Sequence, residues 1–417
     1  MQKLIIKGKK KLSGTISISG SKNASLPILA STILFKKVNL KNIPMVKDVF
    51  TMLELLRFIG LKVSINSKNN SLKILNSNIK INPIAPYKLV KTMRAGVLVL
   101  GPLLSKFKKA KVSLPGGCAI GTRPVDLHLF ALKKLGAKIK IKEGYIYATA
   151  TDGLKGEKIK FPKISVGATE NAIIAATHAT GETVLLNCAI EPEIKDLINF
   201  LKKSGCDIKC NGRKITINSK KKFKNSKHTI MFDRIEAGTY LIASALIGKK
   251  MTLTNLKPKI ISSEIKTLKK MGVKIKVQKN KIVISESSNI KNQVLRTSPY
   301  PGFPTDLQAQ MMVLMTKANG VSKIQENIFE NRFMHVPELK RMGAKIEIKN
   351  NIAIINGPSK LSGAEVMATD LRASVSLVLA GLVAENRTTI NRIYHLDRGY
   401  ENLEKKFVKC KANIKRI

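Results

Sequence analysis

The sequence repeats one short pattern six times, and this repeat limits the possible folds more than any other feature. The pattern is Leu-Lys-Lys-x-Gly-x-Lys-Ile, with a loose first copy and a degenerate last copy that has Lys411 where the others have Gly. Equivalent positions recur about every 70 residues, whereas solenoid repeats recur at roughly 20–50 residues. The copies are Leu56–Val63, Leu132–Ile139, Leu201–Ile208, Leu268–Ile275, Leu339–Ile346 and Phe407–Ile414.

Each copy predicts the end of a helix followed by a strand. Lysine and arginine suit the last turn of a helix, and glycine takes the left-handed position just after it. The alternation that follows, as at Lys138–Ile141, is typical of a strand. Each unit also contains an earlier segment rich in small apolar residues that predicts a buried helix. These segments include Leu26–Leu34, Ala95–Leu104, Ala172–Thr180, Ile235–Leu246 and Ser374–Val383. Six βα units divide naturally into two domains of three.

Length and composition agree with two cytoplasmic α/β domains. The 417 residues exceed what one core usually holds, and 44% hydrophobic residues are enough for packed cores. Met1–Lys11 alternates apolar and basic residues, which predicts a strand and not a signal peptide. The sequence contains no run of about 18 uncharged apolar residues, so it predicts no membrane span. The five cysteines have irregular spacing, which argues against a disulfide framework and a zinc site.

The formal charge of +48 suggests nucleic-acid binding at first sight, but the distribution of charge argues against it. Basic residues are spread along the whole chain, and aromatic residues are only 5% with no tryptophan. Lysine greatly outnumbers arginine, as a mutational bias toward A/T-rich codons would produce on solvated faces. We therefore expect small anionic substrates, which a cationic surface attracts, rather than nucleic acid or membrane as partners.

The segment Pro115–Arg123 has the strongest signal for chemistry. Cys118 lies in a glycine-rich loop between a strand and Pro124, which is a favoured first residue of a helix. A helix N-terminus and the nearby Arg123 both lower the pKa of a thiol, and together they form an anion site. The alternative is a cysteine that only fills space in a turn.

Other candidates lie where strands end and helices begin. Lys22 follows Gly20 at such a point, where an ammonium group can hold a phosphate. The scarce arginines favour sites that need a planar guanidinium, and Arg94, Arg123, Arg234, Arg332, Arg372 and Arg398 lie in turn-like contexts. Asp306 begins a helix after a proline-rich loop, where it is either a general base or a residue that only interacts with the helix dipole.

These motifs together resemble the UDP-N-acetylglucosamine 1-carboxyvinyltransferase family of enolpyruvyl transferases, over essentially the whole chain. The matching segments are Gly20–Ala24, Lys91–Ala95, Leu114–His128, Ser165–Thr169, Glu191–Glu193, Asp233–Glu236, Phe303–Gln310, Phe329–His335, Ala368–Ser374 and Tyr394–Tyr400. The resemblance implies transfer of the enolpyruvyl group of phosphoenolpyruvate to the 3-hydroxyl of UDP-N-acetylglucosamine, in peptidoglycan synthesis. No cofactor and no metal are expected, and the chain is expected to be a monomer or a weak homo-oligomer.

The resemblance also implies an α/β fold of two inside-out α/β barrel domains, each of three repeated βα units. One domain would span 22–229 and carry the Cys118 loop, and the second would combine 1–21 with 230–417. Two small departures occur, Ser21 where Ala is common and Ile190 where Arg is expected.

By the same resemblance, Cys118 is the general acid that protonates the phosphoenolpyruvate methylene, and Asp306 receives the proton of the sugar hydroxyl. Lys22, Arg123 and Arg398 would hold the phosphate, with Arg332 and Arg372 near the carboxylate. The nucleotide-sugar site would be lined by Asn23, Arg94, Arg123, Pro124, Val125, Asp126, Leu127, Lys163, Ser165, Val166, Thr305, Asp306 and Ile328.

Two alternatives remain open. One is the sister transfer to shikimate 3-phosphate on the same fold, against which the loop cysteine argues. The other is a nucleic-acid-binding protein of related repeat architecture, which would show steep salt-dependent RNA binding.

An electrophilic phosphonate tests the role of Cys118. We expect the epoxide fosfomycin to add one label per chain, and we expect Cys118→Ser to abolish the labelling, because the thiolate is the nucleophile. Mass spectrometry of the intact protein measures the adduct. Labelling that survives in Cys118→Ser would remove Cys118 from this role.

Overall fold

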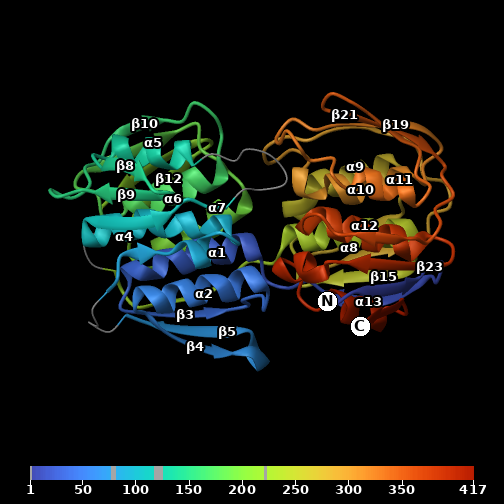
Figure 1. Ribbon diagram of the computed structural model, residues 1–417, viewed down its shortest axis with the longest axis horizontal. Coiled ribbons are helices and arrows are strands. Elements are labelled where there is room, and N and C mark those ends of the chain that lie inside the picture. The colour runs from blue at the N-terminus through green and yellow to red at the C-terminus, as the bar shows by residue number, and fades with distance from the viewer. Residues whose placement is uncertain (1, 77–80, 117–124, 220–222) are drawn as a thin grey trace. The chain divides into compact units, whose positions relative to one another are not determined.

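The computed structural model describes residues 2–76, 81–116, 125–219 and 223–417 of the chain (Figure 1). Internal contacts divide it into two compact units. The described part of the first unit, here called the 20–231 unit, lies between Gly20 and Met231. The described part of the other, here called the 232–417 unit, also includes residues 2–19.

The 20–231 unit contains ten helical segments and twelve strands among its described residues. The helices are α1 (Lys22–Ser31), η1 (Thr32–Leu34), α2 (Lys47–Ile59), η2 (Ser67–Asn69), α3 (Tyr87–Val90), η3 (Arg94–Val99), α4 (Leu100–Phe107), α5 (Asp126–Lys134), α6 (Val166–Ala176) and α7 (Pro192–Lys203). The strands are β3 (Lys37–Lys41), β4 (Lys62–Asn66), β5 (Ser71–Leu75), β6 (Ile84–Ala85), β7 (Lys109–Ser113), β8 (Lys138–Lys142), β9 (Tyr145–Thr149), β10 (Lys158–Lys160), β11 (Glu182–Leu186), β12 (Asp207–Asn211), β13 (Lys214–Asn218) and β14 (Ser226–Thr229).

The 232–417 unit is built in the same way. Its helices are α8 (Arg234–Ile247), η4 (Pro258–Ile261), α9 (Ser262–Lys270), η5 (Thr305–Leu307), α10 (Gln308–Met315), α11 (Val336–Arg341), α12 (Leu371–Val383), η6 (Ile393–Arg398) and α13 (Leu403–Lys409). Its strands are β1 (Leu4–Lys7), β2 (Leu12–Ser17), β15 (Gly248–Thr254), β16 (Ile275–Val277), β17 (Ile282–Ser285), β18 (Val294–Arg296), β19 (Gly320–Gln325), β20 (Ile346–Lys349), β21 (Ile352–Gly357), β22 (Glu365–Met367), β23 (Arg387–Asn391) and β24 (Asn413–Arg416).

The strands form six four-stranded sheets with one common plan. In the orders given next, the first strand of each sheet pairs in parallel with the second. The second strand pairs antiparallel with the third, and the third pairs antiparallel with the fourth, which lies at the edge. The orders are β14-β3-β5-β4, β6-β7-β9-β8 and β10-β11-β13-β12 in the 20–231 unit, and β2-β15-β17-β16, β18-β19-β21-β20 and β22-β23-β1-β24 in the 232–417 unit. The predicted six-fold repeat is therefore confirmed as six sheets of equivalent topology.

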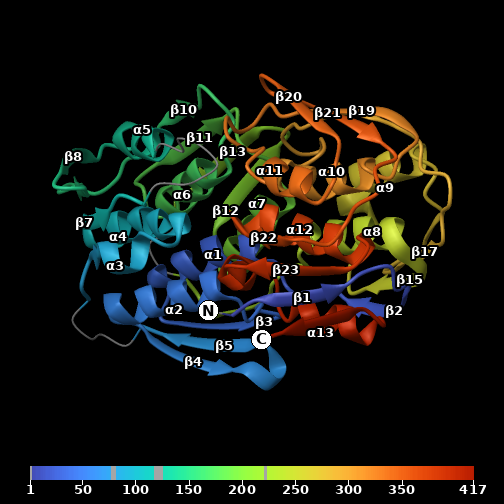
Figure 2. The same cartoon turned by 45° about the vertical axis from the view of Figure 1, so that its right-hand side comes forward.

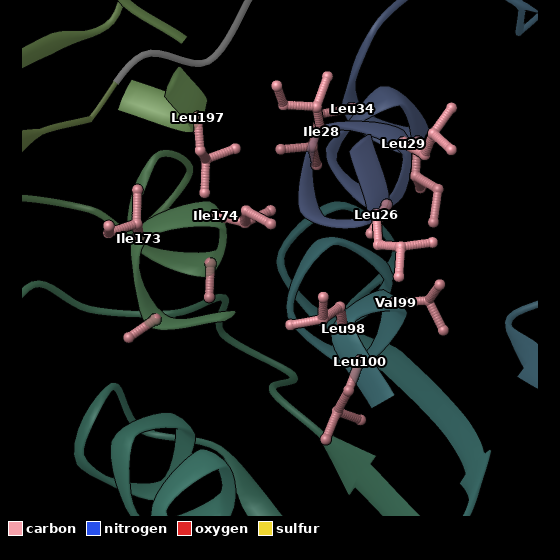
Figure 3. Packing of buried hydrophobic residues seen from close by; sticks show 14 of the residues in the cluster. Leu26, Ile28, Leu29, Leu34, Leu98, Val99, Leu100, Ile173, Ile174 and Leu197 are labelled. Atoms are coloured by element: carbon pink, nitrogen blue, oxygen red, sulfur yellow. The ribbon is translucent and has the colours of Figure 1, made fainter. Parts of the chain in front are cut away.

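The core of each unit consists of three inner helices that pack against one another. In the 20–231 unit these are α1, α4 with η3, and α6, and in the 232–417 unit they are α8, α10 and α12 (Figures 1 and 2). All residues of α8 and of α10 are buried, as expected for helices that are surrounded by protein on every side. Figure 3 shows side chains such as Ile28, Leu98 and Ile174 gathered between the helices that carry them. The helix predicted to begin at Asp306 is present as η5 followed by α10.

Each repeated pattern marks the end of an outer helix, as predicted. Five of the six ends have a glycine in the left-handed region, and the sixth has Lys411, whose φ of 74° lies in the same region. A lysine there costs more than a glycine, since its Cβ crowds the neighbouring backbone. The equivalent residues are Gly60, Gly136, Gly205, Gly272, Gly343 and Lys411.

The last repeat is completed by the first strand of the chain. Strand β1 lies between β23 and β24 and pairs antiparallel with both, so Ile6 is opposite Thr388 on one side and Ile414 on the other. The sixth unit thus uses chain from both termini. None of the described helices is long and apolar enough to cross a bilayer.

A buried asparagine joins two inner helices and gives a test of this core. Asn171 of α6 is fully buried, accepts a hydrogen bond from the Gly101 amide (2.9 Å) and donates one to the Val97 carbonyl (3.2 Å). We expect Asn171→Ala to lower the free energy of unfolding by about 2–4 kcal/mol, because two buried backbone groups lose their partners. Urea unfolding measures the change, with Asn211→Ala on the exposed end of β12 as the control. Equal stability of the two variants would contradict this account.

Candidate functional site

Several of the predicted site residues lie at the beginning of inner helices. Lys22 is the first residue of α1, Arg94 is the first of η3, and Ser165 is the N-cap of α6. In the other unit, Thr305 begins η5 and Arg372 lies in the first turn of α12. The first amide groups of a helix lack partners within the helix, so these ends attract anions.

Lys22 is held in place within the 20–231 unit. Its ammonium nitrogen lies 3.4 Å from Asp48 Oδ2 of α2, and only 12% of its side chain is exposed. The hydroxyl of Ser21 accepts a hydrogen bond from the Ala24 amide (3.2 Å) and caps α1. An alanine could not form this cap, so the departure at Ser21 adds a helix cap next to Lys22.

The beginnings of α5 and α6 lie close together. The Nδ1 atom of His128 in α5 is 3.2 Å from Asn171 Nδ2 of α6. A Cβ on Gly167 would lie 3.1 Å from His128 Cε1, so the two helices approach closely where Gly167 has no side chain. This contact brings the segment at the start of α5 near the segment at the start of α6.

The predicted residues of these two segments differ in exposure. Val125 is buried and Leu127 is partly buried, whereas Asp126 begins α5 exposed to solvent. Lys163 and Val166 are exposed, and Ser165 caps α6 through a hydrogen bond from the Ala168 amide (3.3 Å). Asn23, in the first turn of α1, and Arg94 are partly buried.

Three predicted residues, Cys118, Arg123 and Pro124, lie outside the described residues, and their roles stay predictions. Of the other four cysteines, Cys188, Cys206 and Cys410 are buried and Cys210 is exposed. Burial raises the pKa of Cys188 to about 12, and it also raises the pKa of Cys410. These two buried cysteines are therefore thiols at neutral pH.

Asp306 in the 232–417 unit is the centre of an ion-pair cluster. Its Oδ1 lies 2.8 Å from Arg332 Nη2, and its Oδ2 lies 3.0 Å from Nη2 and 3.2 Å from Nε of Arg372. Both arginines are about 95% buried in their side chains, whereas 27% of the Asp306 side chain is exposed. The cluster combines two positive charges with one accessible carboxylate.

The environment keeps Arg372 charged. Burial by itself lowers the pKa of this guanidinium, but the neighbouring Asp306, Tyr400 and Asp233 outweigh burial and raise it above its ordinary value. Asp370 caps α12 by accepting hydrogen bonds from the backbone amides of Arg372 (2.7 Å) and Ala373 (3.1 Å). The Asp370 carboxylate therefore fixes the backbone of Arg372, and its role is that of a helix cap.

Sequence reasoning missed Glu326, which organises the loop beside Asp306. Its Oε1 accepts hydrogen bonds from the Ile328 amide (2.8 Å) and the Phe329 amide (3.2 Å). Its Oε2 accepts one from the Thr305 hydroxyl (2.9 Å), so one buried carboxylate holds Ile328 and Thr305 together. Its place directly after β19, as one of only 27 acidic residues in a lysine-rich chain, is a signal that could have identified it.

The remaining predicted residues of this unit have defined places. Arg398 is the last residue of η6 and is partly buried, two residues before the buried Tyr400. Ile328 is 36% exposed.

Among the residues that the structure describes, no group of three or more His, Cys, Asp or Glu side chains could hold a metal ion.

Sequence comparison places this arrangement among known proteins. The family of EPSP synthase (3-phosphoshikimate 1-carboxyvinyltransferase) matches residues 6–407. The UDP-N-acetylglucosamine 1-carboxyvinyltransferase of Pelagibacter ubique is 61% identical over the full length of both chains. The enzyme of the same name from Rickettsia bellii is 52% identical, again over the full length of both.

Solved structures share the fold at much lower identity. The enolpyruvyl transferase NikO from Streptomyces tendae superposes with a TM-score of 0.91 at 23% identity, covering 100% of this chain and 98% of that one. An EPSP synthase from Acinetobacter baumannii gives a TM-score of 0.77 at 20% identity, covering 100% of this chain and 99% of that one. The chain has the two-domain α/β fold of the enolpyruvyl transferases, as predicted.

A buried histidine beside Arg332 gives a test by pH. The pKa of His335 is lowered from 6.5 to about 4, mainly by burial; the charge of Asp370 opposes this shift and the charge of Arg332 contributes to it. The unfolded chain therefore binds a proton that the folded chain does not as pH falls from 6.5 to 4, and the free energy of unfolding falls with it. We expect His335→Gln to lose less stability than the wild type over this range. Urea unfolding at a series of pH values measures this, and parallel curves would contradict it.

Proposed function

Because the chain belongs to the family of the UDP-N-acetylglucosamine 1-carboxyvinyltransferases, we propose that it makes enolpyruvyl UDP-N-acetylglucosamine. The enolpyruvyl group comes from phosphoenolpyruvate, the acceptor is the 3-hydroxyl of UDP-N-acetylglucosamine, and phosphate is released. The single observation that carries the proposal is 61% identity over the whole length to a relative of that name. The ion-pair cluster at Asp306 supports it, because this reaction needs a base and cations that bind acidic groups.

Asp306 is proposed to take the proton of the sugar hydroxyl. Its carboxylate is partly exposed and is fixed by two guanidinium groups, so it is accessible and oriented. The deprotonated oxygen attacks C2 of phosphoenolpyruvate, and the methylene carbon C3 accepts a proton from the Cys118 thiol. In the elimination step the bond from C2 to the phosphate oxygen breaks, and C3 returns a proton to a base.

Cationic groups are proposed to balance the charge of phosphoenolpyruvate. Lys22, Arg123 and Arg398 would bind its phosphate, and Arg332 and Arg372 would bind its carboxylate. Arg332 and Arg372 bind Asp306 through only some of the five N–H donors of each guanidinium. The remaining N–H donors would form hydrogen bonds to an anionic substrate. Because these donors are preorganised, they would stabilise the negative charge of the substrate.

The helix caps support binding of the nucleotide sugar to the 20–231 unit. There α1 and α6 are capped by the neutral side chains of Ser21 and Ser165, whereas α8 and α12 in the other unit are capped by Asp233 and Asp370. A neutral cap leaves the positive end of the helix dipole available to an anion. We propose that Asn23, Arg94, Ser165 and Val166, together with Arg123–Leu127 and Lys163, line this site, and that Thr305, Asp306 and Ile328 complete it.

The domain and cellular assignments belong to the same proposal. The domains would span 22–229 and, in the second domain, 1–21 with 230–417. The enzyme would act in the cytoplasm as a monomer or weak homo-oligomer, in the first committed step of peptidoglycan synthesis.

A phosphate-release assay tests the function. The purified chain is incubated with phosphoenolpyruvate and either UDP-N-acetylglucosamine or shikimate 3-phosphate, and inorganic phosphate is measured. We expect release with the nucleotide sugar, and we expect Asp306→Asn to reduce kcat at least 100-fold, since an amide cannot accept the proton. Release with shikimate 3-phosphate alone would overturn the proposal in favour of the sister reaction. Asn211→Ala, on an exposed strand end, is the control with full activity.

A further inference from the structure

Behind the Asp306 carboxylate, five residues from different elements form a closed ring of polar and cation–π contacts. Asp306 binds Arg372 of α12 (3.0 Å), and the guanidinium carbon of Arg372 lies 5.5 Å from the centre of the Tyr400 ring, whose side chain also raises the pKa of Arg372. The Tyr400 hydroxyl lies 2.9 Å from Thr239 Oγ1 of α8. The Nε2 atom of Gln310 in α10 donates to Thr239 Oγ1 (3.1 Å) and to the backbone carbonyl of Asp306 (3.0 Å), which closes the ring.

The direction of each hydrogen bond in the ring follows from the number of available protons. The Thr239 hydroxyl has one proton, which it donates to the Ile235 carbonyl (2.8 Å). The Tyr400 hydroxyl must therefore donate to Thr239 Oγ1, which accepts a second hydrogen bond from Gln310. With its own proton committed, the Tyr400 oxygen can only accept hydrogen bonds, and Gln310 Nε2 (3.4 Å) donates one to it.

Four of the five residues are buried, so the hydrogen bonds among them are costly to lose. Thr239 and Gln310 have no exposed surface, Tyr400 is 3% exposed, and Arg372 is 4% exposed. Hydrogen bonds at low dielectric are stronger than in water, and an unpaired group there has a high cost. The positive charge of Arg372 faces the Tyr400 ring across this 5.5 Å contact, a cation–π interaction that gains strength when it is buried.

We propose that Tyr400 is a positioning residue for the reaction, which orients Asp306 through Arg372, and that Thr239 and Gln310 fix Tyr400 in turn. The inference rests on the proposed function, in which Asp306 takes the substrate proton. Tyr400 contacts the Arg372 guanidinium, whose Nε and Nη2 atoms bind the carboxylate. Without this contact, Arg372 can rotate away from Asp306, and the charged form of the carboxylate loses stabilisation.

Tyr400→Phe tests this role with a matched control. Tyr240, in α8 of the same unit, is also fully buried, and its hydroxyl has no hydrogen-bond partner among the described residues. We expect Tyr400→Phe to lower kcat about tenfold, with KM for UDP-N-acetylglucosamine within about twofold of wild type. We also expect the acid limb of the kcat–pH profile to move to higher pH, because more of the carboxylate is protonated. Tyr240→Phe should keep the wild-type kcat and pH profile.

Thr239→Val supplies a second variant, because it removes the acceptor of the Tyr400 proton and leaves Tyr400 and Arg372 in place. It should change kcat and the acid limb in the same direction by a smaller amount, and it carries the test if Tyr400→Phe does not fold. A wild-type pH profile in both variants would overturn the inference, even if thermal stability falls, since that result shows a structural role only. A wild-type chain that releases no phosphate with UDP-N-acetylglucosamine would overturn the proposed function itself, and it is recognised before any variant is made.

Discussion

The structure depends on the burial of six inner helices, three in each unit, that have almost no solvent-facing surface. In α8 every residue is buried, and the same holds for α10. A helix that is surrounded on all sides must be covered by other elements, so the outer helices and the six small sheets have to enclose it. Polar chemistry is then restricted to the ends of these helices, where unpaired amide groups remain. This is why the predicted site residues gather at helix beginnings and not along helix faces.

The two units treat these helix ends differently, and the difference has chemical consequences. Serine caps at Ser21 and Ser165 leave positive potential at the ends of α1 and α6, and Lys22 is the first residue of α1. Aspartate caps at Asp233 and Asp370 neutralise the ends of α8 and α12. Positive charge in the 232–417 unit comes instead from buried guanidinium groups around Asp306.

Buried polar groups in the 232–417 unit act as one system. Arg372 stays charged because Asp306, Tyr400 and Asp233 outweigh the cost of burial. Thr239 and Gln310 would be costly polar groups in an apolar core if they were not hydrogen-bonded to Tyr400, to each other and to the Asp306 backbone. Core packing and orientation of the proposed base therefore depend on the same side chains.

The sequence by itself determined the six-fold repeat, the helix ends at glycine, and the candidate residues Lys22, Asp306 and Arg372. These features are local, since periodicity, caps and glycine positions are encoded within a few residues. Only the tertiary structure decided that β1 completes the last repeat, because its partners β23 and β24 lie at the other end of the chain. It also decided that Glu326 organises the loop beside Asp306 and that Tyr400 stands behind Arg372. Hydrogen bonds between residues as far apart as Thr239 and Tyr400 leave no spacing pattern, so burial and geometry had to reveal them.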